Sequence, residues 1–195
     1  MRVFLAIDVV QTASAKSTSS VQSALSGLSA EDILESLRTQ ISHPCVKIAR
    51  EAHITLSFFG EISPAEVAMI QQQLKTIVCP TFTLATDSKL GVFSNWNRLR
   101  VIYVPVFYNK TLNQLAIKLQ NMFPSLDTSR GEFLPHITLG RVKQEIADGG
   151  VYAAHLQSIR VEPSISWKVN ELVLYESVLT VQGPVYKRLS SVKLQ

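Results

Sequence analysis

Two stretches of the chain, residues 53–56 and residues 136–139, have the same sequence, His-Ile-Thr-Leu. The 195 residues contain only four histidines, and two of them open these copies. In a β-strand alternate side chains share a face, so each copy would place one imidazole beside one threonine hydroxyl. Two imidazoles can act as general base and general acid, and two hydroxyls can donate hydrogen bonds to a phosphoryl oxygen. The pattern therefore indicates the opening of a strained phosphodiester.

The repetition distinguishes this pattern from an ordinary histidine on a strand. Four residues form the candidate site: His53, Thr55, His136 and Thr138. A single His-x-Thr is ordinarily a packed or surface histidine beside a β-favouring threonine. A strand buried on both faces would need a hydrogen-bond partner for each of these polar groups, so the second copy favours a polar cleft. His43 and His155 have no comparable context, and we interpret both as surface residues.

The composition is that of a globular protein with a small basic excess. Hydrophobic residues make up 46% of the chain and charged residues 17%, which excludes a disordered or fibrous class. The formal net charge of +4 favours anionic partners without identifying one. Two cysteines without Cys-x-x-Cys spacing indicate a reducing compartment, and we expect a cytoplasmic protein. The first ten residues lack the unbroken apolar core of a secretory signal. The sequence contains no run of about 18 apolar residues, so we expect no membrane partner.

Motifs of other enzyme classes do not occur. The histidines lack the spacing of a zinc site and no Asp/Glu cluster accompanies them, so we predict no metal. The chain contains neither a G-x-S-x-G elbow nor a phosphate-binding P-loop. We therefore interpret the serines and threonines as phosphate donors rather than nucleophiles.

Periodicity and capping patterns predict the elements that must position the site. Predicted strands cover residues 3–9, 46–49, 53–59, 81–86, 99–107, 135–142, 165–169, 171–179 and 185–193. A helix is predicted over about 30–41, after a capping box of Ser29 and Asp32. A second begins at Pro64, after a capping box of Ser63 and Glu66, and a third covers the leucine repeat that ends before Pro124. Residues 11–30 could be a loop or a weak helix, and 145–163 is ambiguous, with Gly149-Gly150 interpreted as a turn.

This mixture of strands and helices shows no regular βαβ alternation. It predicts an α+β fold with largely antiparallel sheets. We expect one bilobal catalytic domain over residues 1–195, with approximate lobes 1–90 and 91–195 that could exchange terminal strands. Each lobe would donate one His-Ile-Thr-Leu strand to a shared cleft.

The segments around the two copies resemble the two-histidine phosphoesterase superfamily, specifically its 2'-5' RNA ligase group, also described as RNA 2',3'-cyclic phosphodiesterases. The similar segments are MRVFLAIDV, HITLSFFGE, GVFSNWNRLRVIYVPV, LPHITLGRV and ELVLYESVLTVQGPVY. The resemblance implies a two-lobed α+β fold, with antiparallel sheets lining a central cleft and helices outside. It also implies that His53, Thr55, His136 and Thr138 are the catalytic quartet, with no metal or cofactor required.

The second motif of that family carries an arginine shortly after the threonine, and Arg141 occupies that place as a phosphate-binding candidate. Strict alternation would turn Arg141 away from the face of His136. Its reach to a phosphate therefore depends on twist or on an irregularity near Gly140.

Four aromatic residues are candidates for stacking a base. Phe59 is an even number of residues from His53, so strict alternation places both on one face. Core packing is the role that we favour for Phe59. Phe93, Trp96 and Tyr175 are stacking candidates on the resemblance alone.

The resemblance implies hydrolysis of a 2',3'-cyclic phosphate to a 2'-phosphate at an RNA or nucleotide end, by a protein we expect to be monomeric. One histidine would take a proton from water while the other protonates the departing 3' oxygen. Near symmetry leaves two assignments open, and we favour His53 as acid and His136 as base. The reverse reaction would join ends through a 2',5' linkage. The alternatives are a phosphodiesterase for 2',5'-oligoadenylate or another cyclic nucleotide, and a non-catalytic nucleotide- or RNA-binding module.

Overall fold

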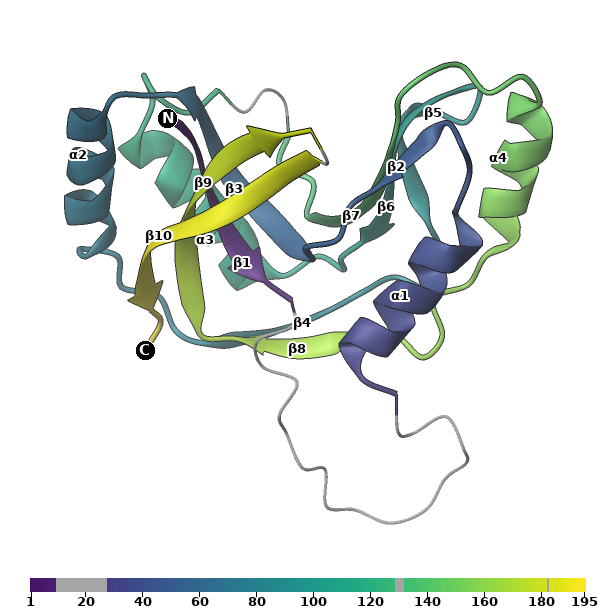
Figure 1. Ribbon diagram of the computed structural model, residues 1–195. Helices are drawn as coiled ribbons and strands as arrows, with labels where there is room; N and C mark the ends of the chain where they lie inside the picture. The colour runs from purple at the N-terminus through teal and green to yellow at the C-terminus, as the bar shows by residue number, and fades with distance from the viewer. Residues whose placement is uncertain (10–27, 129–131, 182) are drawn as a thin grey trace, which may run out of the picture.

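The computed structural model describes residues 1–9, 28–128, 132–181 and 183–195. Two four-stranded antiparallel sheets form two lobes, and a third, two-stranded sheet runs along the base that joins them (Figure 1). Helices lie on the outer sides of the lobes (Figure 1). The predicted α+β class with antiparallel sheets is confirmed. No helix in the described ranges is both long and apolar enough to cross a membrane.

The first large sheet takes its strands from both ends of the chain, whereas the second is built from residues 46–142. The first has the order β10-β9-β1-β3, with bounds β10 Gly183–Lys193, β9 Glu171–Thr180, β1 Arg2–Asp8 and β3 His53–Glu61. The second has the order β2-β7-β6-β5, with bounds β2 Val46–Ile48, β7 His136–Val142, β6 Arg98–Pro105 and β5 Gly91–Asn95. The third pairs β4 Phe82–Ala85 with β8 Ser166–Val169. Each His-Ile-Thr-Leu copy therefore opens a strand of a different large sheet.

Four helices cover the sheets in the described part of the chain. Their bounds are α1 Ala30–Gln40, α2 Pro64–Leu74, α3 Lys110–Met122 and α4 Gly149–Ser158. The predicted capping boxes are present at the starts of α1 and α2, formed by Ser29 with Asp32 and by Ser63 with Glu66. Helix α3 contacts β3, whereas α1 contacts β7 and α4 contacts β6. The apolar faces of these three helices therefore close the core behind a sheet and leave the opposite face of that sheet for the site.

Two expectations about the connecting segments have different outcomes. The expected turn at Gly149-Gly150 is wrong, because both glycines lie in the first turn of α4. The helix forms despite the two glycines because Tyr152, Ala153 and Leu156 are buried on one of its faces. This packing outweighs the low helix propensity of glycine. Most of the segment 11–30, expected to be a loop or weak helix, lies outside the described residues.

Candidate active site

The two motif histidines lie on facing elements of the two lobes. His53 is the first residue of β3 and His136 the first residue of β7. These two strands contact each other although they belong to different sheets. The rings are close enough that a charge on His136 lowers the pKa of His53. The structure therefore brings together the two imidazoles that the sequence pairs.

Each histidine ring is oriented by a backbone carbonyl two residues before it. Nδ1 of His53 lies 3.2 Å from the carbonyl oxygen of Glu51, and Nδ1 of His136 lies 2.8 Å from that of Leu134. A carbonyl oxygen only accepts hydrogen bonds, so Nδ1 must carry the proton in both rings. This leaves Nε2 of each ring as the atom that can gain or lose a proton.

Aromatic side chains of the first sheet pack around His53. The ring of Phe4 lies 5.2 Å from the His53 ring, and the edge of Tyr186 meets it at the same centroid distance. Tyr175 stacks on Phe4 at 5.4 Å and donates its hydroxyl to both carboxylate oxygens of Asp8, at 2.9 and 2.8 Å. Burial, followed by this contact with Asp8, raises the pKa of Tyr175. Tyr175 therefore belongs to the wall behind His53, one ring removed from the imidazole.

A similar pair of rings surrounds His136. Phe93 meets the His136 ring edge-on at 4.9 Å, and Tyr103 lies 5.1 Å from it. Phe93 and Tyr103 also stack on each other, with centroids 4.4 Å apart. The candidate Phe93 thus borders the reactive ring directly.

This packing depresses the basicity of both imidazoles. Burial, which disfavours the charged form, lowers the pKa of His53 to about 4, and His136 and Arg141 add smaller contributions of the same sign. Burial also lowers the pKa of His136, followed by the positive charge of Arg141. Both shifts favour the neutral form of the rings in the unliganded protein. An anion bound between them would favour the protonated form of either ring.

The first His-Ile-Thr-Leu strand contains a β-bulge at its leucine. Thr55 pairs with Ala6 of β1 and Ser57 pairs with Leu5, so Leu56 is an extra residue without a partner. A bulge of this kind shifts the alternation of side chains by one position. Residues 57–59 are consequently on the faces opposite to those that strict alternation gives, and a second irregularity, at Phe59, restores the original alternation from Gly60 onward.

The second copy has a bulge at the equivalent leucine. Thr138 pairs with Tyr103 of β6 and Gly140 pairs with Ile102, so Leu139 has no partner in the ladder. The next pair joins Arg141 to Val101. The irregularity that Arg141 needs is therefore present at the expected place.

The bulge turns Arg141 toward the catalytic face. Val101, its partner, also pairs with Phe93, whose ring touches His136. The positive charge of Arg141 acts on both histidines, lowering the pKa of His53 and of His136. The structure thus assembles Arg141 with the two rings, although strict alternation would separate them.

The bulge at Leu56 in β3 changes the face on which Phe59 lies. Its side chain is only 2% exposed and meets Phe123 edge-on in the core. The expectation that Phe59 shares the face of His53 and could stack a base is therefore wrong. Phe58 takes that face instead, because it pairs with Phe4, and Arg2 lies over its ring at 5.1 Å.

The two threonines lie two residues beyond the histidines, before each bulge, and are partly exposed. Neither hydroxyl has a hydrogen-bond partner among the described residues, so Thr55 and Thr138 are both available as donors. Within the same ranges, no three His, Cys, Asp or Glu side chains form a group that could hold a metal ion. The chemistry that this arrangement offers is proton transfer beside two hydroxyl donors and one guanidinium.

Comparison with known proteins places this geometry in a family. The chain matches the model of the 2'-5' RNA ligase superfamily over residues 28–179. It is a member of the 2'-5' RNA ligase superfamily. As a member, it carries the two histidine-threonine pairs inside the matched region.

Relatives of this superfamily member align over nearly its whole length. It is 28% identical to an RNA 2',3'-cyclic phosphodiesterase of Archaeoglobus fulgidus, with 97% of this chain and 98% of the relative covered. It is 31% identical to an RNA 2',3'-cyclic phosphodiesterase of Aeropyrum pernix, over 82% of this chain and 94% of the relative. Among solved structures, Escherichia coli LigT complexed with phosphate is similar, with a TM-score of 0.70, 25% identity and coverage of 99% and 96%.

Several residues of this superfamily member's site lie in segments that resemble the family, but no local pattern assigns them to the site. Tyr186 comes from β10, which is separated from β3 by β9 and β1, so only the sheet order places it beside His53. Tyr103 is opposite Thr138 through a register that the bulge determines. Phe4 is placed by the register of β1 against β3. Such neighbours depend on pairing between distant segments and not on local composition.

Gly91 makes room for the ring behind His136, which gives a testable consequence in this superfamily member. A Cβ on Gly91 would lie 2.5 Å from Cε2 and Cζ of Tyr103. We expect Gly91→Ala to displace that ring and to cost about 1–3 kcal/mol of stability, as overpacking does. Thermal unfolding and the NMR resonances of His136 measure both effects. Gly150→Ala, whose Cβ would meet nothing within 4 Å, is the matched control, and equal stability of the two variants would contradict this role of Gly91.

Proposed function

We propose that this protein is a metal-independent RNA 2',3'-cyclic phosphodiesterase that forms a 2'-phosphate. The observation that carries the proposal is the convergence of two imidazoles, each held by Nδ1 with Nε2 left for proton transfer. Membership of the superfamily and relatives named RNA 2',3'-cyclic phosphodiesterases support the choice of reaction. The substrate is an RNA or oligonucleotide end that carries a cyclic phosphate.

In the proposed reaction the cyclic phosphate lies between β3 and β7. Thr55 and Thr138 donate hydrogen bonds to its nonbridging oxygens, and Arg141 balances their negative charge. Nε2 of one histidine takes a proton from water as the water oxygen bonds to phosphorus. Nε2 of the other donates a proton to the 3' oxygen as its bond to phosphorus breaks. The product keeps the phosphate on the 2' oxygen.

The lowered pKa values of the two histidines determine the pH dependence. The productive form has one neutral and one protonated imidazole, which is most abundant between the two pKa values. Because the pKa of His53 is about 4 and that of His136 is below 6.5, we expect kcat/KM to peak between these limits. A pH series of kcat/KM with a cyclic-phosphate dinucleotide measures the peak. A maximum above pH 7 would contradict it.

Product analysis tests the reaction itself. We expect the purified protein, in chelator, to convert an oligonucleotide with a 2',3'-cyclic phosphate end to the 2'-phosphate isomer. Separation of the two isomers by chromatography identifies the product. Exclusive formation of the 3'-phosphate would overturn the direction of cleavage, and binding without turnover of cyclic or 2',5'-linked substrates would indicate a nucleotide-binding module. Incubation with a 5'-hydroxyl end tests the reverse joining reaction.

The roles of the two histidines can be separated with a substrate whose leaving group needs no proton. We propose His53 as the acid and His136 as the base. Because the pKa of His53 is lowered the more strongly, this assignment uses the less abundant of the two singly protonated forms of the free protein. A nitrophenyl phosphodiester loses nitrophenolate without acid assistance, so its hydrolysis needs the base more than the acid. We expect His53→Ala to retain much more of its activity on this substrate than His136→Ala does. The opposite ranking would exchange the two roles.

A further inference from the structure

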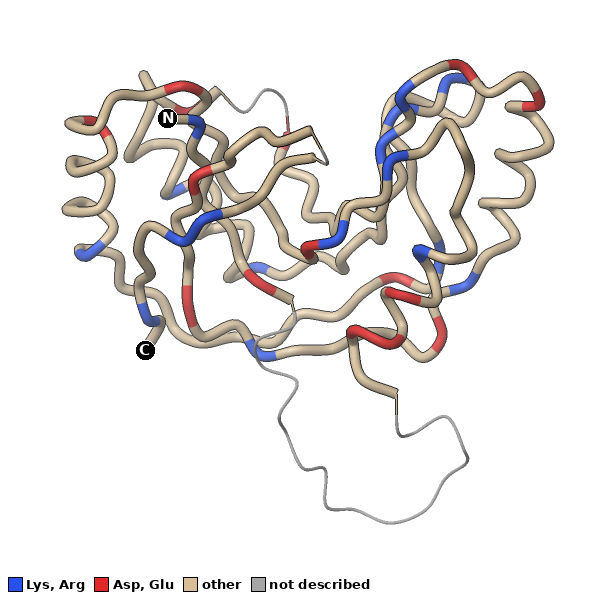
Figure 2. Tube along the Cα trace, viewed as in Figure 1, with Lys and Arg blue, Asp and Glu red and all other residues tan. Residues whose placement is uncertain are grey.

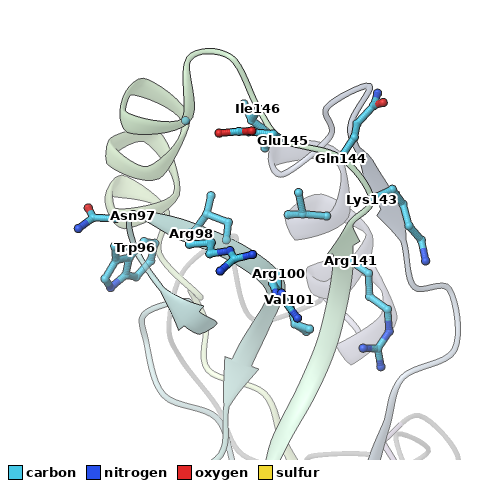
Figure 3. Close-up of a pocket in the computed structure, with 13 residues that line it drawn as sticks. Trp96, Asn97, Arg98, Arg100, Val101, Arg141, Lys143, Gln144, Glu145 and Ile146 are labelled. Carbon is cyan, nitrogen blue, oxygen red and sulfur yellow. The ribbon is translucent and has the colours of Figure 1, made fainter.

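A pocket of about 960 Å³ lies beside the candidate active site, at the outer ends of β6 and β7. One wall consists of residues 96–101, from the β5–β6 turn and β6, and the other consists of residues 141–146, from the end of β7 onward. Arg141 belongs both to this pocket and to the surroundings of the two histidines. Figure 3 shows the side chains of both walls around the same space. The pocket therefore shares one arginine with the site.

Positive charge dominates this pocket. Its lining contains four cationic side chains, Arg98, Arg100, Arg141 and Lys143, and one carboxylate, Glu145. None of the four cations forms an ion pair within the described residues, whereas the arginines of α1 and β10 each contact a carboxylate. Figure 2 shows Lys and Arg gathered along the inner side of the lobe formed by β2, β5, β6 and β7. Uncompensated like charges held together are complementary to an anion.

A further bulge, in β6, helps to build this charged wall. Val101 pairs with Phe93 and Leu99 pairs with Ser94, so Arg100 is an extra residue in β6. Leu99 packs against the core, while Arg98 and Arg100 point toward the pocket (Figure 3). Lys47 of β2 is the pairing partner of Arg141 and adds another cation beside it. The arrangement thus comes from three strands and not from one mobile loop.

The cations extend over a distance that one nucleotide does not span. From Thr138 to Lys143 the chain advances five residues, about 17 Å at the rise of an antiparallel strand. A cyclic phosphate held by the threonines would be at one end of this path, and the pocket is at the other. A 2',3'-cyclic phosphate terminates an RNA strand, so the rest of that strand must continue from its 5' side. The negative charges of its regularly spaced phosphates complement the positive charges along this path, and the strand is long enough to follow it.

We propose that this pocket is a subsite for the RNA phosphates upstream of the cyclic phosphate, contacted by Arg98, Arg100 and Lys143. The inference rests on the proposed cyclic phosphodiesterase activity and specifies its substrate as a single-stranded oligoribonucleotide. A cyclic mononucleotide reaches only the quartet and Arg141. An oligonucleotide adds contacts to the pocket, so it is the better substrate and its binding is the more sensitive to salt.

Two measurements with the full-length protein test the subsite. The first compares kcat/KM for a cyclic mononucleotide and for a hexanucleotide with a cyclic-phosphate end. We expect the wild type to prefer the hexanucleotide by at least about tenfold, and the triple variant R98Q/R100Q/K143Q to lose most of this preference. The second measures the Kd of a hexanucleotide with a 2'-phosphate end by fluorescence anisotropy over a salt series. Each phosphate contact contributes about 0.7 to the slope of log Kd against log salt, so the variant's slope falls by about 2.

A matched variant separates this subsite from a general effect of charge. The variant K75Q/K110Q/K118Q also removes three positive charges. These lysines are exposed and lie after α2 and on α3, on the outer side of the other lobe. We expect it to keep both the preference and the salt slope of the wild type. Equal slopes for wild type and R98Q/R100Q/K143Q would overturn the subsite, as would an equal loss in the two triple variants. If no cyclic phosphate is hydrolysed the proposed function fails, and the anisotropy slopes still decide whether the pocket binds RNA.

Discussion

Replacement of either motif histidine by alanine is expected to reduce kcat for a cyclic-phosphate dinucleotide by about 10²-fold or more, the usual contribution of general acid–base catalysis. His53→Ala removes one proton-transfer atom and His136→Ala removes the other. Because both protons move in the same step, the double variant should lose little more than the single ones. Steady-state kinetics at the pH optimum of the wild type measures these changes.

Controls must show that the fold survives these substitutions. His155→Ala is the matched variant, because His155 lies on α4 with its ring bonded to the carbonyl oxygen of Gln40, outside the site. We expect it to retain wild-type turnover. Circular dichroism and the thermal midpoint should remain those of a folded protein in all variants. Near-wild-type hydrolysis by both His53→Ala and His136→Ala would eliminate the paired-histidine mechanism.

Arg141→Met is expected to have two effects that a purely structural residue would not produce together. Loss of the guanidinium should lower kcat/KM by about 10²–10³-fold, the scale of losing one donor to a developing anion. It should also raise the pKa of His53 and of His136, because the cation that disfavours their protonated forms is gone. The pH profile should therefore move to higher pH. Titration of the two imidazoles by NMR measures the shift directly.

Two matched variants sharpen the test of Arg141. Arg141→Lys keeps the charge but not the planar pair of donors, so we expect a smaller pKa change and a substantial loss of activity. Lys168→Met removes one exposed charge from β8, in the third sheet, and should leave both pKa values and turnover unchanged. Histidine pKa values that stay constant or fall in Arg141→Met would contradict the placement of the guanidinium.

The quartet and most elements around it could be predicted from the sequence because their signals are local. The capping boxes at Ser29 and Ser63 lie within four residues each, and both are present. The two His-Ile-Thr-Leu strands were recognisable from period-2 alternation over a few residues. Helix α4 was not, because Gly149-Gly150 is a turn signal locally and only packing of the following residues stabilises the helix.

The faces of residues beyond each threonine could not be predicted in this way. A bulge arises where two strands pair, so the sequence of β3 alone does not reveal that Leu56 lacks a partner in β1. That missing information explains the wrong face assigned to Phe59 and the unresolved face of Arg141. It also explains why Tyr186, from the last strand, was not recognised beside His53.

The exchange of strands between the two large sheets has a consequence for how the molecule unfolds. β2 lies early in the chain yet completes the sheet of β7, and β9 and β10 lie at its end yet complete the sheet of β1. A fragment of residues 1–90 would lack β9, so one edge of β1 would be unpaired. A fragment of residues 91–195 would lack β2, the neighbour of β7. Neither piece can close its own hydrogen-bond ladder. Denaturation should accordingly be a single cooperative transition, and severed halves would have to reassociate before either regained a native sheet.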